Sequence, residues 1–180
     1  MATSLKATLP VLGRLIGISP NILYERQKVL MQEGVLETIA GRGPGSGVLA
    51  TPDSLTLLLI AFLASPLKLS DLAETTMRVA NAPPTVGKQC PLTGKKTFRD
   101  ALAAALSDVQ LLERVTRIQV AGSHSHAEIH FRAKRKVEIS AFDGHKVENP
   151  GRRFDFSLIL DEMPESFDKA IAGLFDDAAN

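Results

Sequence analysis

The chain has 180 residues, of which 44% are hydrophobic and 23% are charged, with a formal net charge of +1. This composition is ordinary for a globular protein with one substantial core or two small ones. The single cysteine, Cys90, excludes an internal disulfide framework and fits a reducing compartment. The longest apolar run, Leu55–Ala64, is about half of the roughly 20 residues that a membrane span needs. The N-terminus lacks a signal-peptide pattern, so we expect a cytoplasmic protein outside any membrane.

Charge is distributed unevenly along the chain. Residues 85–153 contain thirteen Lys/Arg and seven Asp/Glu, whereas residues 154–180 contain one and seven. A basic middle and an acidic tail fit a nucleic-acid surface with a tail that partly neutralises it. Two solvated faces of one folded domain fit the same pattern equally well.

Two short helices are predicted at the N-terminus. In Leu5–Gly17 the apolar residues recur at helical spacing, and Pro10 suits a first helical turn. Ser19 followed by Pro20 is a capping residue followed by a first-turn proline, so a second helix begins there. It is predicted to run to Gln32 or Glu33, with Gly34 as the residue that ends it.

The next segments are predicted to form a hairpin, two helices and a linker. Val35–Ile39 and Val48–Ala50 are short β-capable runs on either side of a glycine-rich loop, which indicates a hairpin. A cap-proline-acid start predicts a helix over residues 51–64, and Ser-Asp opens another over residues 70–81. Residues 82–96 contain three prolines and two glycines and are predicted to be a linker.

The C-terminal part is predicted to be a small α+β module. A helix is expected from Thr97 to about Arg114, and a closing helix from Pro164 to Phe175. Between them, four segments alternate apolar and polar residues as antiparallel strands do: Thr116–Ala121, Ala127–Ala133, Val137–Phe142 and Phe154–Leu160. The predicted class is therefore α+β, with a helix-turn-helix unit over residues 1–65, a helix and linker over 66–96, and a dimerisation or effector module over 97–180.

The turn between the first two helices is typical of a helix-turn-helix. Gly17 tolerates a positive φ, Ile18 fills the space between the helices, and Ser19 caps the second helix. An ordinary helical hairpin has the same turn chemistry. On the second helix we expect the inward side chains to be Ile22, Leu23, Val29 and Leu30, and the outward ones to be Asn21, Tyr24, Glu25, Arg26 and Lys28.

The outward side chains suit DNA. Asn21 and Tyr24 are at the helix end that approaches base edges, and Arg26 and Lys28 have the reach to contact phosphates. Glu25 either accepts a hydrogen bond from cytosine or pairs with a neighbour. In the glycine-rich loop Arg42 suits a narrow minor groove, and the glycines allow close approach to a phosphate chain. A nucleotide-binding loop is disfavoured because the lysine-serine/threonine ending is missing.

This segment resembles the DNA-binding domain of the GntR family of winged helix-turn-helix regulators. The likeness is gapless from Ile16 to Gly43 and lies within residues 9–51. The residues that carry it are Gly17-Ile18-Ser19, Glu25, Leu30, Glu33-Gly34-Val35-Leu36-Glu37 and Gly41-Arg42-Gly43. The resemblance implies a dimer on a roughly palindromic site, with wing contacts from Gly41, Arg42 and Gly43. Pro20 and Tyr24 stand where the family usually has arginines that contact operator guanines.

Other polar clusters are interpreted more simply. Three histidines, His124, His126 and His130, would share one face of a strand, either as a zinc or nickel site or as a solvent-facing strand. The basic run from Arg132 to Lys136 is either a DNA contact or a solvated turn. No nucleophile triad, catalytic carboxylate pair or metal-hydrolase motif is present, so we expect no enzymatic activity and no cofactor.

The sequence therefore favours a sequence-specific transcriptional regulator that binds double-stranded DNA as a homodimer. The proposed contacts are Ser19, Asn21, Tyr24, Glu25, Arg26, Lys28, Gly41, Arg42 and Gly43. Two alternatives remain open. One is a winged-helix factor that binds another protein, as an antagonist or assembly factor does. The other is a DNA-binding accessory of replication or recombination.

Overall fold

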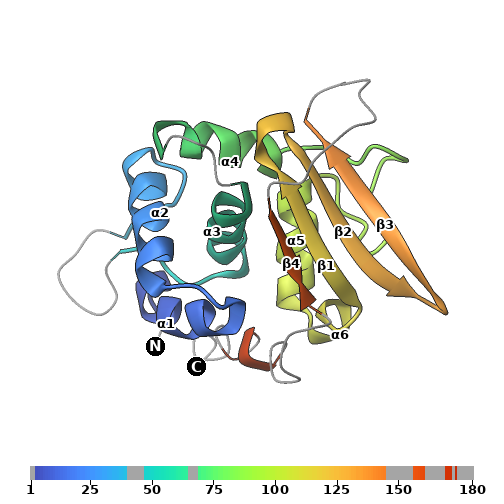
Figure 1. Ribbon diagram of the computed structural model, residues 1–180, viewed down its shortest axis with the longest axis horizontal. Helices are drawn as coiled ribbons and strands as arrows, with labels where there is room; N and C mark the ends of the chain where they lie inside the picture. Colours follow the sequence, from blue (N-terminus) through green and yellow to red (C-terminus); the bar gives the residue numbers. More distant parts are fainter. Residues whose placement is uncertain are drawn as a thin grey trace.

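The computed structural model describes residues 3–39, 47–64, 69–144, 156–160, 169–171 and 173. These residues form an α+β structure in which helices pack against a four-stranded antiparallel sheet (Figure 1). The coarse class predicted from the sequence is confirmed. One hydrophobic cluster extends from Leu5 near the N-terminus to Leu158 in the last strand, so the helices and the sheet share a core.

The first two helices form as the sequence predicts. Helix α1 spans Leu5–Ile16 and helix α2 spans Pro20–Gln32. Gly17 ends α1 with φ 72°, a conformation that favours glycine. The Ser19 hydroxyl accepts a hydrogen bond from the Asn21 backbone N–H at 3.4 Å, which caps α2. Gly34, with φ 69°, follows the end of α2 at the expected place.

The predicted hairpin after α2 is described only at its base. Ile39 and Gly47 exchange two backbone hydrogen bonds of 2.9 Å, and residues 40–46 lie outside the described residues. The returning segment pairs with the start of the chain: Leu5 N–H donates to Val48 at 2.7 Å, and Ala50 N–H donates to Thr3 at 2.9 Å. The run Val48–Ala50 was expected to pair with Val35–Ile39. It pairs with the start of the chain instead, and the pairing with the run after α2 is limited to Ile39 and Gly47.

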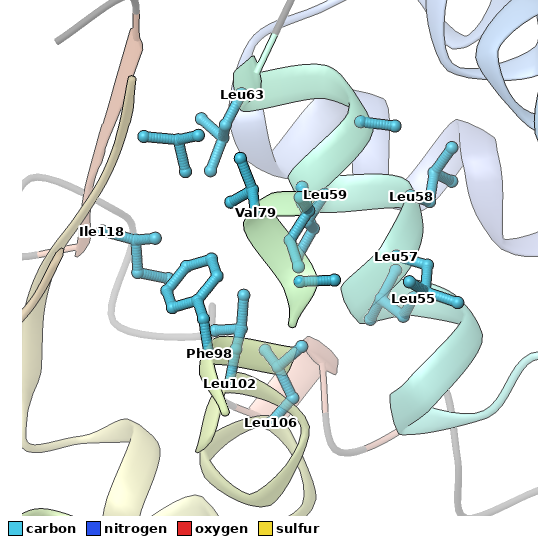
Figure 2. Close-up of a cluster of buried hydrophobic side chains, with 14 of the residues drawn as sticks. Leu55, Leu57, Leu58, Leu59, Leu63, Val79, Phe98, Leu102, Leu106 and Ile118 are labelled. Carbon is cyan, nitrogen blue, oxygen red and sulfur yellow. The ribbon is translucent and has the colours of Figure 1, made fainter. Parts of the chain in front are cut away.

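Helix α3 (Pro52–Ala64) occupies the centre of the molecule. Ten of its thirteen residues are buried, as expected for a helix that is apolar on all sides. It packs against α2 and against α4 (Leu72–Ala80), α5 (Phe98–Ser107) and β1 (Val115–Ala121). Figure 2 shows leucines of α3 gathered with Val79, Phe98 and Ile118 from these other elements. A short 3-10 turn, Leu69–Asp71, precedes α4. Both helices agree with the sequence-based expectation.

The predicted linker over residues 82–96 is instead packed against the sheet. The Thr85 N–H donates to Ala141 at 2.8 Å, and the Asp143 N–H donates to Pro83 at 2.9 Å. Cys90, the thiol of this loop, is buried and free, as is common for a structural cysteine. The Phe98 N–H donates to Ala82 at 3.0 Å, which closes the loop at its ends. Prolines and glycines here form a fixed loop.

The single helix predicted from Thr97 to Arg114 is divided in two. Helix α5 ends at Ser107, and a short helix α6 spans Val109–Leu112. Asp108 between them is extended, with φ −131° and ψ 110°. Its carboxylate accepts from the backbone N–H groups of Gln110 at 2.9 Å and Leu111 at 3.3 Å. Aspartate caps a helix better than it continues one, so the apolar periodicity alone gave too long a helix.

The four predicted strands are confirmed. They are β1, β2 (His126–Ala133), β3 (Lys136–Asp143) and β4 (Phe156–Ile159), in the order β3-β2-β1-β4. Ile118, Ile129 and Phe142 lie on the face covered by helices, where the rings of Phe98 and Phe142 have centroids 5.3 Å apart. The sheet is therefore single-sided, as its alternation predicts.

Two further findings concern the ends of the fold. Residues 169–171 and 173 are helical, within the predicted closing helix, and Ile171 is buried against the core. Among the described residues, no helix combines the length and apolar character needed to cross a membrane.

Candidate nucleic-acid interface

The turn between α1 and α2 is held by a close backbone approach. The Ile18 N–H donates to the Gly13 carbonyl at 2.8 Å. A Cβ atom on Gly13 would lie 2.7 Å from the Ile18 carbonyl oxygen, a distance that real Cβ atoms do not tolerate. Gly13 therefore fixes how α2 leaves α1. The sequence analysis did not single out Gly13, although a glycine inside a helix is a signal of such an approach.

Helix α2 buries one face and exposes the opposite one. Its buried residues are Leu23, Gln27 and Leu30, which recur at helical spacing. The exposed side carries four hydrogen-bonding side chains in one row at positions i, i+4, i+7 and i+11: Asn21, Glu25, Lys28 and Gln32. We call this row the α2 polar stripe. Three of its members were predicted, and Gln32 was missed because it lies at the helix end.

Ile22 was predicted to face inward, and this prediction is wrong. Its side chain is 42% exposed. The buried face of α2 is formed by Leu23, Gln27 and Leu30. Ile22 directly precedes Leu23, and because neighbouring helical residues are rotated by about 100°, its side chain lies outside this face. Leu23 and Leu30 are buried as predicted, and Val29 packs against the core while partly exposed. The apolar Ile22 thus lies beside the α2 polar stripe.

Arg26 was predicted to point outward, but it is half-buried against α3. Its guanidinium lies 5.6 Å from the centre of the Phe62 ring, and its Nη1 donates to the Ile22 carbonyl at 3.3 Å. Burial lowers the pKa of the Arg26 guanidinium. The reason is its spacing from Leu23 and Leu30, which places it on the inner side of the helix. A phosphate contact from Arg26 is disfavoured by this geometry.

Tyr24 lies where two positive charges converge. The Lys6 ammonium from α1 is 4.7 Å from the centre of the Tyr24 ring, and the Lys28 ammonium is 6.0 Å from it. Lys28 also forms an ion pair of 3.3 Å with Glu25. These contacts join the outer surfaces of α1 and α2 through cation–π attraction. Lys6 was not predicted as a site residue, because its partner is on another helix.

The predicted wing residues Gly41, Arg42 and Gly43 lie outside the described residues. Below the hairpin base there is a cavity of about 400 Å³ between the chain after α2, the start of α3 and Arg99 of α5. The Arg99 guanidinium donates hydrogen bonds to both carboxylate oxygens of Asp53, and the one from Nε to Oδ1 is 2.6 Å long. The hydrogen bond to Asp53 raises the pKa of Arg99. This ion pair ties the start of α3 to α5.

Only two of the three histidines predicted to share one strand face do so: His126 and His130 lie on the same face of β2, and His124 lies outside the strand. His124 lies in a 3-10 turn, Gly122–His124, with Nδ1 2.8 Å from the Ser123 hydroxyl. His126 and His130 lie on β2 on either side of Glu128, with Nε2 atoms 3.1 and 2.8 Å from its two carboxylate oxygens. His126 is also only 3% exposed, and Asp143 Oδ2 on the adjacent strand lies 3.7 Å from its Nδ1.

The chemistry of this cluster is that of a hydrogen-bonded network. The hydrogen bond from His126 holds the pKa of the Glu128 carboxyl below its ordinary value, burial acts in the opposite direction, and His130 adds to the lowering. Within the described part of the chain, no three His, Cys, Asp or Glu side chains are arranged to hold a metal ion.

The basic run forms the turn between β2 and β3, as one of its two interpretations predicted. Arg132, Lys134, Arg135 and Lys136 are all exposed, and Lys134 has a positive φ of 56°. This turn lies at the lower right of Figure 1, across the molecule from α1 and α2. A DNA contact made by α2 and one made by this turn would therefore involve different faces of the protein.

Comparisons with known proteins add no family to this geometry. No protein-family model matches the chain. The searches of curated proteins and of solved structures also give no match.

Proposed function

We propose that the protein is a sequence-specific transcriptional regulator that binds double-stranded DNA as a homodimer, with α2 as the recognition helix. The observation that carries the proposal is the α2 polar stripe: four exposed hydrogen-bonding side chains in one row, on a helix whose exit angle Gly13 fixes. A recognition helix needs this combination of a locked orientation and a donor-rich outer surface.

The order of the segments supports a winged helix-turn-helix. The chain start pairs with Val48–Ala50, two helices lie between, and the Ile39–Gly47 pair marks the base of a hairpin. The loop itself, residues 40–46, lies outside the described residues, and in this proposal it acts as the wing. The likeness to the GntR DNA-binding domain, carried by residues such as Gly17 and Glu33-Gly34, favours the same interpretation.

The stripe offers defined chemistry to base edges. Asn21, near the helix start, suits bidentate hydrogen bonding to adenine, and Glu25 suits the amino group of cytosine. Ile22 offers an apolar contact for a thymine methyl group. Lys28 and Lys6, gathered around Tyr24, suit phosphates on one strand. With Pro20 and Tyr24 in place of the usual arginines, the preferred operator should differ from those of typical family members.

The test is a DNA-binding titration by fluorescence anisotropy with the DNA upstream of the protein's own gene, at several salt concentrations. We expect Lys6→Ala with Lys28→Ala to weaken binding to all sequences and to reduce the salt slope by about one per lysine removed. Asn21→Ala should cost about 1–3 kcal/mol of discrimination at one base position. Lys88→Ala, an exposed lysine on the loop before α5, is the matched control.

Binding to DNA that is equally tight in the wild type and in the Lys6/Lys28 double variant would contradict the proposal. If the wild type does not bind DNA at all, the second candidate function is a winged-helix factor that binds a protein. Exposed apolar side chains on both helices, Val11 and Ile22, favour it. The discriminating measurement is retention on immobilised nonspecific DNA. A protein-binding factor would elute with the low-salt wash.

A further inference from the structure

Strand β3 forms an edge of the sheet, and only part of that edge is covered. The sheet order places β3 outermost, at the right of Figure 1. The segment Pro83–Thr85 covers its end, through hydrogen bonds to Ala141 at 2.8 Å and from Asp143 at 2.9 Å. The first half of the strand, Lys136–Ile139, is exposed at every residue.

The backbone of this first half is oriented to accept another strand. The Ala141 carbonyl and the Asp143 N–H point away from β2, toward Pro83–Thr85. Alternation along a strand gives Val137 and Ile139 the same outward direction for their N–H and C=O groups. Within the described part of the chain these groups have no hydrogen-bond partner. An open edge of this kind is a template for strand addition.

The side chains of the open edge are apolar on one face and charged on the other. Val137 and Ile139 are 57% and 53% exposed, on the sheet face that the helices do not cover. Lys136 and Glu138 are exposed on the opposite face. Two large aliphatic side chains on an unpaired edge are costly in water, so the edge gains from a partner.

We propose that two copies of this chain pair through β3, antiparallel and with the two-fold axis at Val137. This register makes Val137 its own partner and lets the two copies exchange both of its outward hydrogen bonds. It also places Lys136 of each copy directly opposite Glu138 of the other, which gives two ion pairs across the strands.

Other registers lack these matches. An axis at Ile139 places Glu138 opposite Ser140, and an axis at Glu138 places two glutamates opposite each other. Lysines on an edge normally prevent strand addition, and here Lys136 and Glu138 make the edge selective for its own copy. The inference goes beyond DNA binding and rests on the proposed function only for its homodimer. The pairing is tested without DNA.

The experiment is sedimentation velocity on the full chain over a wide concentration range, with charge reversal at the two positions. Lys136→Glu and Glu138→Lys each turn two attractions into two repulsions, so each should weaken the dimer about tenfold or more. The double variant restores opposite charges and should regain the wild-type affinity. Mixing the two single variants should give a heterodimer tighter than either homodimer. Lys169→Glu, the same charge change at an exposed helical residue outside the sheet, is the control.

Three results would overturn the inference: a wild-type chain that stays monomeric throughout, single variants that associate like the wild type, or a double variant as weak as the singles. Circular dichroism checks that the variants are folded, as their exposure leads us to expect. If Lys136→Glu lowers DNA affinity while association is unchanged, the β2–β3 turn is a nucleic-acid contact and self-pairing is excluded. Dimerisation that follows the charge pattern in a protein that fails to bind DNA would support the inference and contradict the proposed function.

Discussion

Helices α2 and α3 have the same length and pack against each other, yet they differ greatly in how many of their side chains are buried. Each has thirteen residues. Helix α2 buries three of them and exposes a polar stripe, whereas α3 buries ten. A helix buried on all sides has no surface to offer a partner, and its residues are selected for packing. The comparison makes α3 the packed centre of the fold and α2 the helix with a polar surface available for the proposed DNA contact.

The largest expected effect comes from removing packing in α3. Leu58 is fully buried, so Leu58→Ala should lower the free energy of unfolding by about 2–5 kcal/mol. Ile22→Ala on α2 removes a half-exposed side chain and should cost much less. Urea denaturation of both variants checks this. Equal losses at the two positions would mean that α2 is as deeply packed as α3.

The next effect concerns the orientation of α2. Gly13→Ala places a Cβ against the Ile18 carbonyl, and the turn must shift, which we expect to cost about 1–3 kcal/mol. Because α2 then leaves α1 at a changed angle, DNA affinity should fall as well. Val11→Ala on the same helix is the control, with a change within about 0.5 kcal/mol. Unchanged stability and affinity in Gly13→Ala would show that the turn is adaptable.

A smaller effect separates the two cations of α2. Arg26→Ala loses the contact with Phe62 and should cost about 1 kcal/mol of stability. Lys28→Ala, on the exposed side, should leave stability within about 0.5 kcal/mol and change DNA binding instead. Denaturation and anisotropy on both variants test the distinction. It fails if Lys28→Ala is the more destabilised of the two.

The smallest effect extends the comparison to carboxylates. The folded-state pKa of Glu128 is lowered, so its stabilisation is fully present above its unfolded pKa of about 4.3 and is lost as the pH falls through the lower folded value. Glu128→Gln should therefore flatten the pH dependence of the melting temperature below about pH 4.5. The idea fails if Glu128→Gln melts with the wild-type pH profile.

Elements whose signals are local could be predicted from the sequence. The cap at Ser19, the glycine ends of α1 and α2 and the alternation of the four strands all depend on neighbouring residues, and each was placed within a few positions. The α2 polar stripe was largely foreseen for the same reason. The break at Asp108 was missed because apolar periodicity outweighed the capping preference of one aspartate.

Partners that are distant in sequence could not be predicted. Arg26 was assigned to the outside because Phe62 lies thirty-six residues later, and only the folded structure brings them together. His126 was expected either to bind a metal or to face solvent, but it is only 3% exposed and lies beside Asp143 on the next strand. The loop after α4 was taken as a linker because its pairing partner, Ala141, is more than fifty residues away. Tertiary contacts overrode composition in each case.

The central position of α3 also determines how the protein unfolds. Helix α3 packs on α2 at one side and on α5 and β1 at the other. Unfolding of α3 would therefore expose the apolar side chains of both the N-terminal helices and the sheet to water. We expect one cooperative unfolding transition, with the amide hydrogens of α3 among the slowest to exchange with solvent. A fragment ending before residue 52 would expose Leu23 and Leu30, so α2, the proposed recognition helix, depends for its stability on a helix that lies outside the segment resembling a DNA-binding domain.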